Sequence, residues 1–455
     1  MPNKISPLRI IIFLYVCFTF YSCNQLSSEK TQRIKVNINN DWLYLENNTK
    51  DIAKALSQND WEKVNLPHSW NALDATDISP GYRRSASWYK KDLSIPNVVS
   101  GQIYQFYFEG VNIESEVYVN GKKVGGHTGG YIGFTLDITD DISVGNNEIL
   151  VRADNTYNPE VIPSQKSDFF IFGGITRDVW LQTFPAQHLE DLRITTPNVS
   201  NTSADLNATI EVTNASADAK VRATLSDSQG KDILSSEFNV VDNAAEINFK
   251  NIKNLKLWDT DNPNLYTLKI QLLSNNEVGD ELSEKVGFRW FEFKDHGAFY
   301  LNGKRVLLRG THRHEEHAVV GAAMSNEQHR ADMELIKDMG TNFVRLAHYP
   351  QDPEVYKACD ELGLLVWDEL PWCRGGLGND AWKKNTKQML KEIINQNYNH
   401  PSIILWSLGN EIYWLPDFEN GDDREKINMF LNELNDYAHE LDPTRKTAIR
   451  KYYEG

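Results

Sequence analysis

Hydrophobic and polar positions alternate along the chain between residues 34 and 295. Runs such as Gln105-Phe106-Tyr107-Phe108 and Glu148-Ile149-Leu150-Val151 show the two-residue period of strands with one buried face. Turn residues such as Asn120-Gly121 separate these runs, and short strands at this spacing predict β-sandwiches. Near residue 185 the chain becomes rich in Asn, Ala, Asp and Ser. We therefore predict one sandwich over 34–184 and a second, immunoglobulin-like sandwich over 185–295.

The pattern changes to alternating strands and helices over residues 296–455. "RVLLRG" and "TNFVRLAHYP" are typical of strands, whereas Asn326 to Met339 places Met333, Ile336 and Met339 on one face of a helix. Strand and helix alternate five times with short links, which predicts parallel strands joined by right-handed crossovers. We expect the N-terminal part of a (β/α)8 TIM barrel, with about five of its eight strands.

Polar residues follow each of these five apolar strands. In a TIM barrel the carboxyl ends of the strands surround the active site, so polar residues at five strand ends predict its position. The polar ends are Arg313-His314-Glu315, Arg345 with His348, Asp368-Glu369, Asn410-Glu411 and Tyr452-Tyr453-Glu454.

Glu411 stands out because it ends an apolar strand and is followed by aromatic residues, in "SLGNEIYW" (407–414). Tyr413 and Trp414 would desolvate a carboxyl group at this position and raise its pKa, which suits an acid catalyst. The alternative interpretation is a loop glutamate that pairs with an arginine or a lysine.

Composition limits the classes of partner. A chain of 455 residues is expected to form two to four domains. The formal net charge of −16 argues against an electrostatic nucleic-acid partner. Beyond the N-terminal region only Cys359 and Cys373 are present, which are too few for a disulfide framework.

The first 22 residues have the pattern of an export signal. Lys4 and Arg9 supply positive charge, and Ile10 to Tyr21 is apolar but shorter than the roughly 20 residues that cross a bilayer. Ser22-Cys23 and the polar tether over 23–33 resemble the processing site of a bacterial lipoprotein, which would leave Cys23 carrying lipid. A plain secretory signal is the alternative. We expect a protein exported to the cell envelope, in the periplasm or anchored by lipid to the outer membrane.

A series of motifs in chain order resembles glycoside hydrolase family two, the family of β-galactosidases and β-glucuronidases, over nearly all of the chain after residue 40. The motifs are "VNLPHSWN" (64–71), "ASWYKK" (86–91), "FEGVNIESEVYVNGKKVGGHTGGYIGF" (108–134), "GGITRDVWL" (173–181), "NLYTL" (264–268), "VGFR" (286–289), "RGTHRHEEH", "VRLAHYP", "WDELP" and "WSLGNE". The resemblance implies a sugar-binding jelly-roll domain, an immunoglobulin-like sandwich and a catalytic barrel. It also implies retaining hydrolysis of an oligo- or polysaccharide β-glycoside, in carbohydrate catabolism.

The same resemblance implies roles for individual residues. Glu411 matches the general acid/base, which protonates the leaving oxygen and then activates water, and Asn410 matches the residue that hydrogen-bonds the sugar 2-hydroxyl. His314 and His348 match histidines that contact the sugar. Arg345 matches an arginine that orients the catalytic nucleophile.

Three further residues are candidates for the sugar pocket. Asp168, which precedes Phe169-Phe170, resembles an aspartate that some β-galactosidases extend into the pocket from the N-terminal domain. An aspartate that caps a turn is an equally common alternative. Glu369 and Trp372 are expected to line the cleft, with supporting or core positions as the alternatives.

A second carboxylate is needed for this chemistry, because a retaining glycosidase uses an acid/base and a nucleophile about 5–5.5 Å apart. In this family the nucleophile lies on the seventh barrel strand, whereas the sequence ends 44 positions after Glu411. Glu454 does not resemble the nucleophile motif. The sequence therefore predicts a fragment that lacks the nucleophile and has no glycosidase turnover by itself.

The substrate is less defined than the family. "RHEEH", "AHYP" and Asp168 favour a β-galactosidase, and a β-glucuronidase or a β-mannosidase of the same family are the alternatives. Some β-galactosidases bind magnesium through a Glu-x-His-Gly segment after the third barrel strand, but "DELPWCRGG" has no histidine there, so no metal is predicted. No cofactor is expected either. A non-catalytic, carbohydrate-binding surface lipoprotein is the alternative from another functional class.

Overall fold

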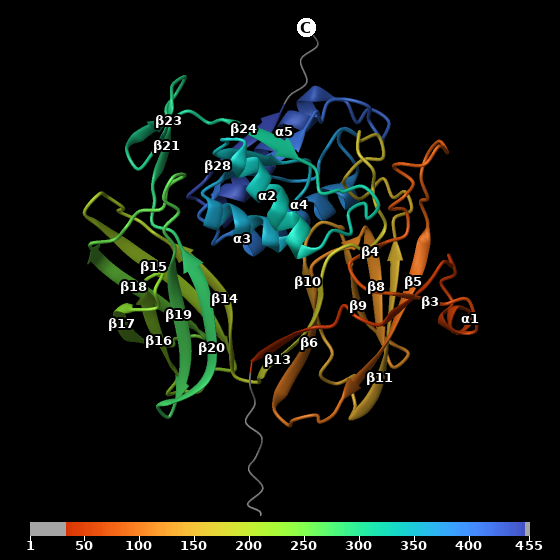
Figure 1. Ribbon diagram of the computed structural model, residues 1–455, viewed down its shortest axis with the longest axis horizontal. Helices are drawn as coiled ribbons and strands as arrows, with labels where there is room; N and C mark the ends of the chain where they lie inside the picture. The colour runs from red at the N-terminus through yellow and green to blue at the C-terminus, as the bar shows by residue number, and fades with distance from the viewer. Residues whose placement is uncertain (1–32, 451–455) are drawn as a thin grey trace, which may run out of the picture. The chain divides into compact units, whose positions relative to one another are not determined.

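The computed structural model describes residues 33–450 (Figure 1). The predicted export signal, most of the tether, the candidate lipid site Cys23 and the candidate strand end at Glu454 lie outside these residues, so they stay predictions. Among residues 33–450, no helix combines the length and the apolar character needed to cross a membrane.

The first sandwich is built from thirteen short strands, and its buried positions follow the two-residue period of the sequence. In the strand Gln102–Phe108 every second residue is buried, including Phe106 and Phe108 in the core. The sheet orders are β1-β13-β6-β10, β3-β2-β5-β11-β8-β9 and β4-β12-β7, and the pairs are antiparallel. The elements are β1 (Ile34–Asn37), β2 (Trp42–Leu45), α1 (Ile52–Leu56), β3 (Glu62–Val64), β4 (His68–Ser69), β5 (Ala86–Ile95), β6 (Gln102–Phe108), β7 (Val111–Asn112), β8 (Glu114–Val119), β9 (Lys122–Thr128), β10 (Phe134–Asp137), β11 (Gly145–Asp154), β12 (Gly174–Ile175) and β13 (Val179–Pro185).

The second sandwich packs two antiparallel sheets, β14-β15-β18 and β17-β16-β19-β20, against each other. Aliphatic side chains such as Ile210, Val221 and Leu268 alternate into its core. This arrangement confirms the predicted immunoglobulin-like sandwich. The strands are β14 (His188–Thr195), β15 (Ser203–Thr213), β16 (Lys220–Ser226), β17 (Asp232–Asn239), β18 (Ala244–Lys253), β19 (Tyr266–Ser274) and β20 (Glu277–Val286).

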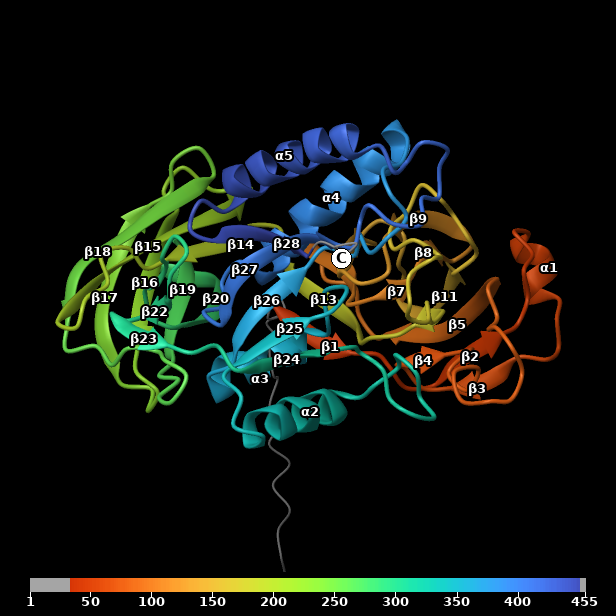
Figure 2. The same cartoon turned by 90° about the horizontal axis from the view of Figure 1, so that it is seen from above.

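The third domain contains the predicted partial barrel. Its five strands form one parallel sheet in the order β24-β25-β26-β27-β28. Figure 2 shows these strands side by side, with α4 and α5 along one edge and α2 and α3 along the other. The elements are β24 (Gly310–Arg313), α2 (Asn326–Asp338), β25 (Phe343–Leu346), α3 (Pro353–Leu362), β26 (Leu365–Glu369), α4 (Asp380–Asn397), β27 (Ile403–Asn410), α5 (Arg424–Leu441) and β28 (Lys446–Arg450).

Two local predictions differ from the structure. The "RVLLRG" segment is divided: Lys304–Val306 is β23 of a small sheet with β21 (Phe291–Phe293) and β22 (Phe299–Leu301), and the first barrel strand begins only at Gly310. Met339 is the C-cap of α2 and is 67% exposed, so it does not extend the buried face formed by Met333 and Ile336. The helix ends there because Gly340 follows with a left-handed φ of 81°.

N-terminal capping residues fix where the helices begin, and so fix the loops that join them to the strand ends. Ser325 and Gln328 form a capping box at the start of α2. The Asp352 side chain caps α3, whose first residue is Pro353. The residues between β25 and α3, which include His348, are therefore held between a strand end and a capped helix.

Candidate active site

The carboxyl ends of β25, β26 and β27 bring four polar side chains together. Parallel pairing aligns these strands, with Arg345 opposite Trp367 and Glu369 opposite Ser407. We call the resulting group the strand-end cluster; its members are Arg345, His348, Glu369 and Asn410, and all four are buried. The sequence placed each of them at a strand end, and the structure brings them into contact.

Glu369 lies at the centre of the strand-end cluster. Its carboxylate accepts hydrogen bonds from Arg345 Nε at 2.9 Å and Nη2 at 2.8 Å, from His348 Nδ1 at 2.7 Å and from Ser407 Oγ at 2.8 Å. Burial alone would raise the pKa of Glu369, but the His348 hydrogen bond and the Arg345 charge lower it overall. An ionised Glu369 with both oxygens engaged is suited to orient Arg345 and His348 rather than to contact a sugar.

Arg345 connects Glu369 to Asn410. Its Nη2 donates to Asn410 Oδ1 at 2.9 Å, and Asn410 Nδ2 lies 3.5 Å from Cys373 Sγ. The sequence interpretation gave Arg345 a nucleophile to orient, whereas among the described residues its carboxylate partner is Glu369. The hydrogen bond from Arg345 fixes the amide of Asn410 in one orientation. A residue that hydrogen-bonds a sugar hydroxyl needs such a fixed orientation.

Glu411 follows directly after β27 with a left-handed φ of 52°. Non-glycine residues adopt this conformation uncommonly, and such positions cluster at functional sites. Its carboxylate is 17% exposed and accepts a hydrogen bond from Arg374 Nε at 3.1 Å. The arginine pairing that the sequence analysis left as an alternative is thus present, at a position that still opens to solvent.

Arg374 also holds the candidate residue from the first sandwich. Its Nη2 donates to Asp168 Oδ2 at 2.6 Å, and its guanidinium lies 4.6 Å from the centroid of the Trp414 ring. One arginine therefore joins Asp168 to Glu411 across 243 positions of sequence. Arg374 was not predicted from the sequence, in which only the Gly375-Gly376 pair after it indicates a tight loop.

His314 lies beside His348 with ring centroids 5.2 Å apart, and Phe169 packs 5.5 Å from His314. Its Nδ1 is buried and has no hydrogen-bond partner among residues 33–450. Burial, followed by the neighbouring His348, lowers the pKa of His314 to about 4. His314 is therefore neutral near pH 7 and can exchange one hydrogen bond with a ligand.

This lowered pKa predicts a loss of stability in acid. In the unfolded chain the pKa of His314 is about 6.5. Keeping His314 neutral in the fold therefore costs no free energy of unfolding above about pH 6.5, and stability is lost as the pH falls from there toward 4. We expect the melting temperature of His314→Gln to fall less than that of the wild type between about pH 7 and pH 4.5. His317→Gln, at an exposed histidine three positions away, is the matched control and should keep the wild-type fall. Equal falls for the wild type and His314→Gln would contradict the prediction.

Trp372 lies in the core behind the strand ends. Its side chain is fully buried, its indole Nε1 donates to Gly376 O at 2.9 Å, and its ring packs against Trp382 and Phe430. The sequence favoured a position lining the cleft, with supporting and core positions as alternatives, and the structure shows the core position. Trp372 supports the loop that carries Cys373 and Arg374.

A second buried ion pair fixes the loops that carry the two histidines. Arg177, from the "GGITRDVWL" segment, donates to Glu315 Oε1 from Nε at 3.0 Å and to the carbonyl of Pro350 at 2.7 Å. Glu315 Oε2 accepts from the backbone nitrogen of Asp352 at 2.6 Å. Glu315 is the residue after His314, and the pair is hydrogen-bonded to Pro350 and Asp352 in the loop after His348. Arg177 was not predicted as a functional residue, because the sequence indicates it only as part of a family motif.

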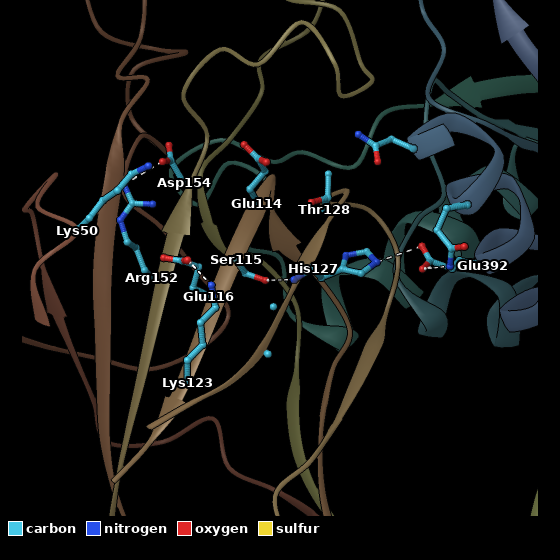
Figure 3. A pocket seen from close by; sticks show the side chains of 14 residues that line it. Lys50, Glu114, Ser115, Glu116, Lys123, His127, Thr128, Arg152, Asp154 and Glu392 are labelled. Carbon is cyan, nitrogen blue, oxygen red and sulfur yellow. Dashed lines mark hydrogen bonds and ion pairs between the residues drawn. The ribbon is translucent and has the colours of Figure 1, made fainter. Parts of the chain in front are cut away.

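A hollow of about 620 Å³ lies elsewhere, between the β8 to β9 edge of the first sandwich and α4 (Figure 3). Several of its charged groups are paired with one another: Lys123 with Glu116, Arg152 with Asp154, and His127 Nε2 at 3.1 Å from Glu392. Its lining includes no residue of the strand-end cluster and neither Asp168 nor Glu411, so this hollow is separate from the strand ends. The strand ends remain the candidate active site, since they combine an accessible carboxylate with buried groups that orient its neighbours.

Comparison with known families identifies all three domains. Residues 34–185 match the model for "Glycosyl hydrolases family 2, sugar binding domain", residues 187–289 match "Glycosyl hydrolases family 2", and residues 291–452 match "Glycosyl hydrolases family 2, TIM barrel domain". The order of the domains is the one that the motifs implied.

Two named relatives are similar over nearly all of this chain. A Formosa agariphila protein with the name "Putative beta-glucuronidase" is 69% identical over 452 residues, which cover 98% of this chain and 54% of that protein. A β-galactosidase of Thermoanaerobacterium thermosulfurigenes is 35% identical over 91% of this chain and 58% of its own length.

Among solved structures, the β-glucuronidase of Parabacteroides merdae superimposes with a TM-score of 0.87 at 38% identity, over 92% of this chain and 55% of that one. A β-glucuronidase of Bacteroides uniformis gives 0.85 at 32% identity, over 92% of this chain and 52% of that one. The chain therefore spans about half the length of these relatives. Three successive domain matches and these similarities show that the chain belongs to glycosyl hydrolases family 2.

Proposed function

We propose that the intact protein hydrolyses β-glucuronides, with Glu411 as its general acid/base. The observation that carries the chemistry is the position of Asn410-Glu411 at the end of β27, where the buried Arg345 and Glu369 fix the asparagine and the glutamate remains accessible. This is where a TIM barrel presents its catalytic groups.

The geometry supports one half of a retaining mechanism. Glu411 would give its proton to the leaving oxygen in the first step and accept a proton from water in the second. Asn410 would hold the sugar 2-hydroxyl, an interaction that strengthens at the transition state. The second carboxylate is not assigned among residues 33–450, because Glu369 is enclosed by its hydrogen-bond donors and Asp168 is paired with Arg374.

Arg374 must release Glu411 during this cycle or move with it. Its guanidinium is shared between two carboxylates and the Trp414 ring, so losing one contact leaves two others in place. A sugar that enters beside Glu411 can therefore replace one hydrogen bond without leaving Arg374 unpaired.

The substrate proposal corrects the expectation from sequence. The sequence motifs favoured a β-galactosidase, but the 69% identical relative and the solved structures of Parabacteroides merdae and Bacteroides uniformis carry the name β-glucuronidase. The β-galactosidase of Thermoanaerobacterium thermosulfurigenes is 35% identical, about half the 69% identity of the Formosa agariphila relative. We therefore place the glucuronide first and the galactoside second.

A direct comparison of substrates tests the proposal. The intact protein is given aryl β-glucuronide and aryl β-galactoside with the same leaving group, and kcat/KM is measured for each. We expect at least about a tenfold preference for the glucuronide, equivalent to roughly 1.4 kcal/mol of selective transition-state binding. A preference for the galactoside would overturn the substrate proposal, and no hydrolysis of any β-glycoside would overturn the proposed chemistry.

A further inference from the structure

We propose that Asp168, His348 and Cys373 form a binding site for a thiophilic divalent cation of the zinc and cadmium class. One ligand atom from each residue, a carboxylate oxygen, an imidazole nitrogen and the thiol sulfur, lies within 4.8 Å of the other two. The three residues come from the loop after β11, the loop after β25 and the loop after β26. Oxygen, nitrogen and sulfur in this combination are a donor set that zinc-class ions accept.

His348 is oriented for this role by a carboxylate. Its Nδ1 donates to Glu369 Oε1 at 2.7 Å, which leaves the lone pair on Nε2 for a ligand. A carboxylate that accepts from the other ring nitrogen is the usual support of a metal-binding histidine. Arg345 Nη2 lies 3.1 Å from the same Nδ1 and so does not occupy Nε2.

Cys373 supplies the sulfur. It is fully buried, and Asn410 Nδ2 lies 3.5 Å from its Sγ. Burial raises the pKa of this thiol to about 12, so Cys373 is protonated until a cation binds. Binding forms the metal–sulfur bond and releases the thiol proton to solvent.

The surrounding charges suit a divalent ion. Asp168, Glu369 and Glu411 are formal anions and the sulfur becomes a fourth on binding, while Arg345 and Arg374 are the formal cations in contact with them. A charge of +2 therefore makes the group neutral. The Arg374 guanidinium occupies Oδ2 of Asp168, so Oδ1 is the oxygen that remains for the ion.

The donors need only a small contraction. Zinc bonds of about 2.0–2.3 Å place tetrahedral ligands roughly 3.5 Å apart, so each pair must close by at most about 1.3 Å. The Asp168 side chain is 52% exposed and can supply much of this movement. The ring of His314 lies next to His348, with centroids 5.2 Å apart, and its buried Nδ1 has no partner among the described residues.

An ion at this position lies against Asn410 and next to Arg374, the partner of Glu411. If the proposed function holds, it would exclude the sugar, and zinc-class ions would inhibit the enzyme competitively. Binding itself does not depend on that function, because all three donors are given by the structure.

Cadmium titration of the intact, reduced protein tests the site without any substrate. A cadmium–thiolate bond has an ultraviolet charge-transfer band, which we expect to saturate at one ion per chain. Cys373→Ser should abolish the band, and Cys359→Ser, at a fully buried cysteine that packs on Met333, is the matched control that should keep it. Glu369→Gln should weaken binding about 10- to 100-fold through His348. The melting temperature of each variant is measured in parallel to confirm that it is folded.

A band that persists in Cys373→Ser, or no band in the wild type, would overturn the proposal. A band lost only in Cys359→Ser would do so too. Since the titration reads the metal–sulfur bond, its failure would leave the glucuronide test unaffected, and a failed glucuronide test would leave the cadmium result unaffected.

Discussion

Replacing Glu411 by glutamine in the intact protein is expected to lower kcat/KM for an aryl β-glucuronide by about 10²- to 10⁴-fold, the usual contribution of a positioned acid or base. Glutamine keeps the size of the side chain and can still accept from Arg374, so the site should stay assembled. Only proton transfer to the leaving oxygen and from water is removed. The loss is measured as kcat/KM at one pH, with the melting temperature as a check on folding.

Two comparisons separate this role from a structural one. Substrates whose leaving group is already acidic need less proton donation, so the loss in the glycosylation step should shrink as leaving-group acidity rises. Added azide, a nucleophile that needs no base, should restore part of the turnover of Glu411→Gln. Glu419→Gln, at an exposed carboxylate in the same loop, is the matched control and should keep wild-type activity. Equal activity of Glu411→Gln and Glu419→Gln would contradict the assignment.

Replacing Arg177 by methionine is expected to destabilise the protein by about 3–5 kcal/mol, because the Glu315 carboxylate would remain buried without its charge partner. Both side chains are almost completely enclosed, at 1% and 3% exposure, and Nη2 of Arg177 lies 2.9 Å from Glu315 Oε1. Arg177 also satisfies the carbonyls of Tyr131 and Pro350, which would lose a donor. The change is measured by denaturant unfolding, with the midpoint and the slope compared.

A double variant distinguishes loss of the pair from loss of packing. Arg177→Met combined with Glu315→Leu removes both charges, so it should cost less than the sum of the two single changes. Lys387→Met breaks an exposed ion pair with Glu433, whose Nζ to Oε2 distance is 2.9 Å, and should change stability by no more than about 1 kcal/mol. An Arg177→Met variant as stable as Lys387→Met would show that the buried pair does not hold the two histidine loops.

The features that the sequence predicted correctly are those with a local cause. The alternation in Gln102–Phe108 predicted a strand with one buried face, and the strand has that pattern of burial. The five apolar runs with polar ends predicted parallel barrel strands, and pairing along β24 to β28 confirms them. The period of apolar residues indicates which face of a strand or helix is buried. It is therefore informative for every element that packs against the core with one face only.

The features that the sequence missed depend on partners that are distant along the chain. Arg374 bonds Asp168, 206 positions away, and Arg177 bonds Glu315, 138 positions away. No periodicity connects such pairs, because the fold rather than the local pattern brings them together. Trp372 illustrates the same limit: an aromatic residue after a barrel strand fits a cleft, yet the positions of Trp382 and Phe430 place it in the core.

The most direct test of the account is a crystal structure of the intact protein with a bound inhibitor derived from glucuronic acid. We expect the ligand at the ends of β25 to β27, with the atom that replaces the glycosidic oxygen within hydrogen-bond distance of Glu411 and the 2-hydroxyl on Asn410. A ligand in the hollow between β9 and α4, or one that leaves Glu411 without contact, would contradict the account.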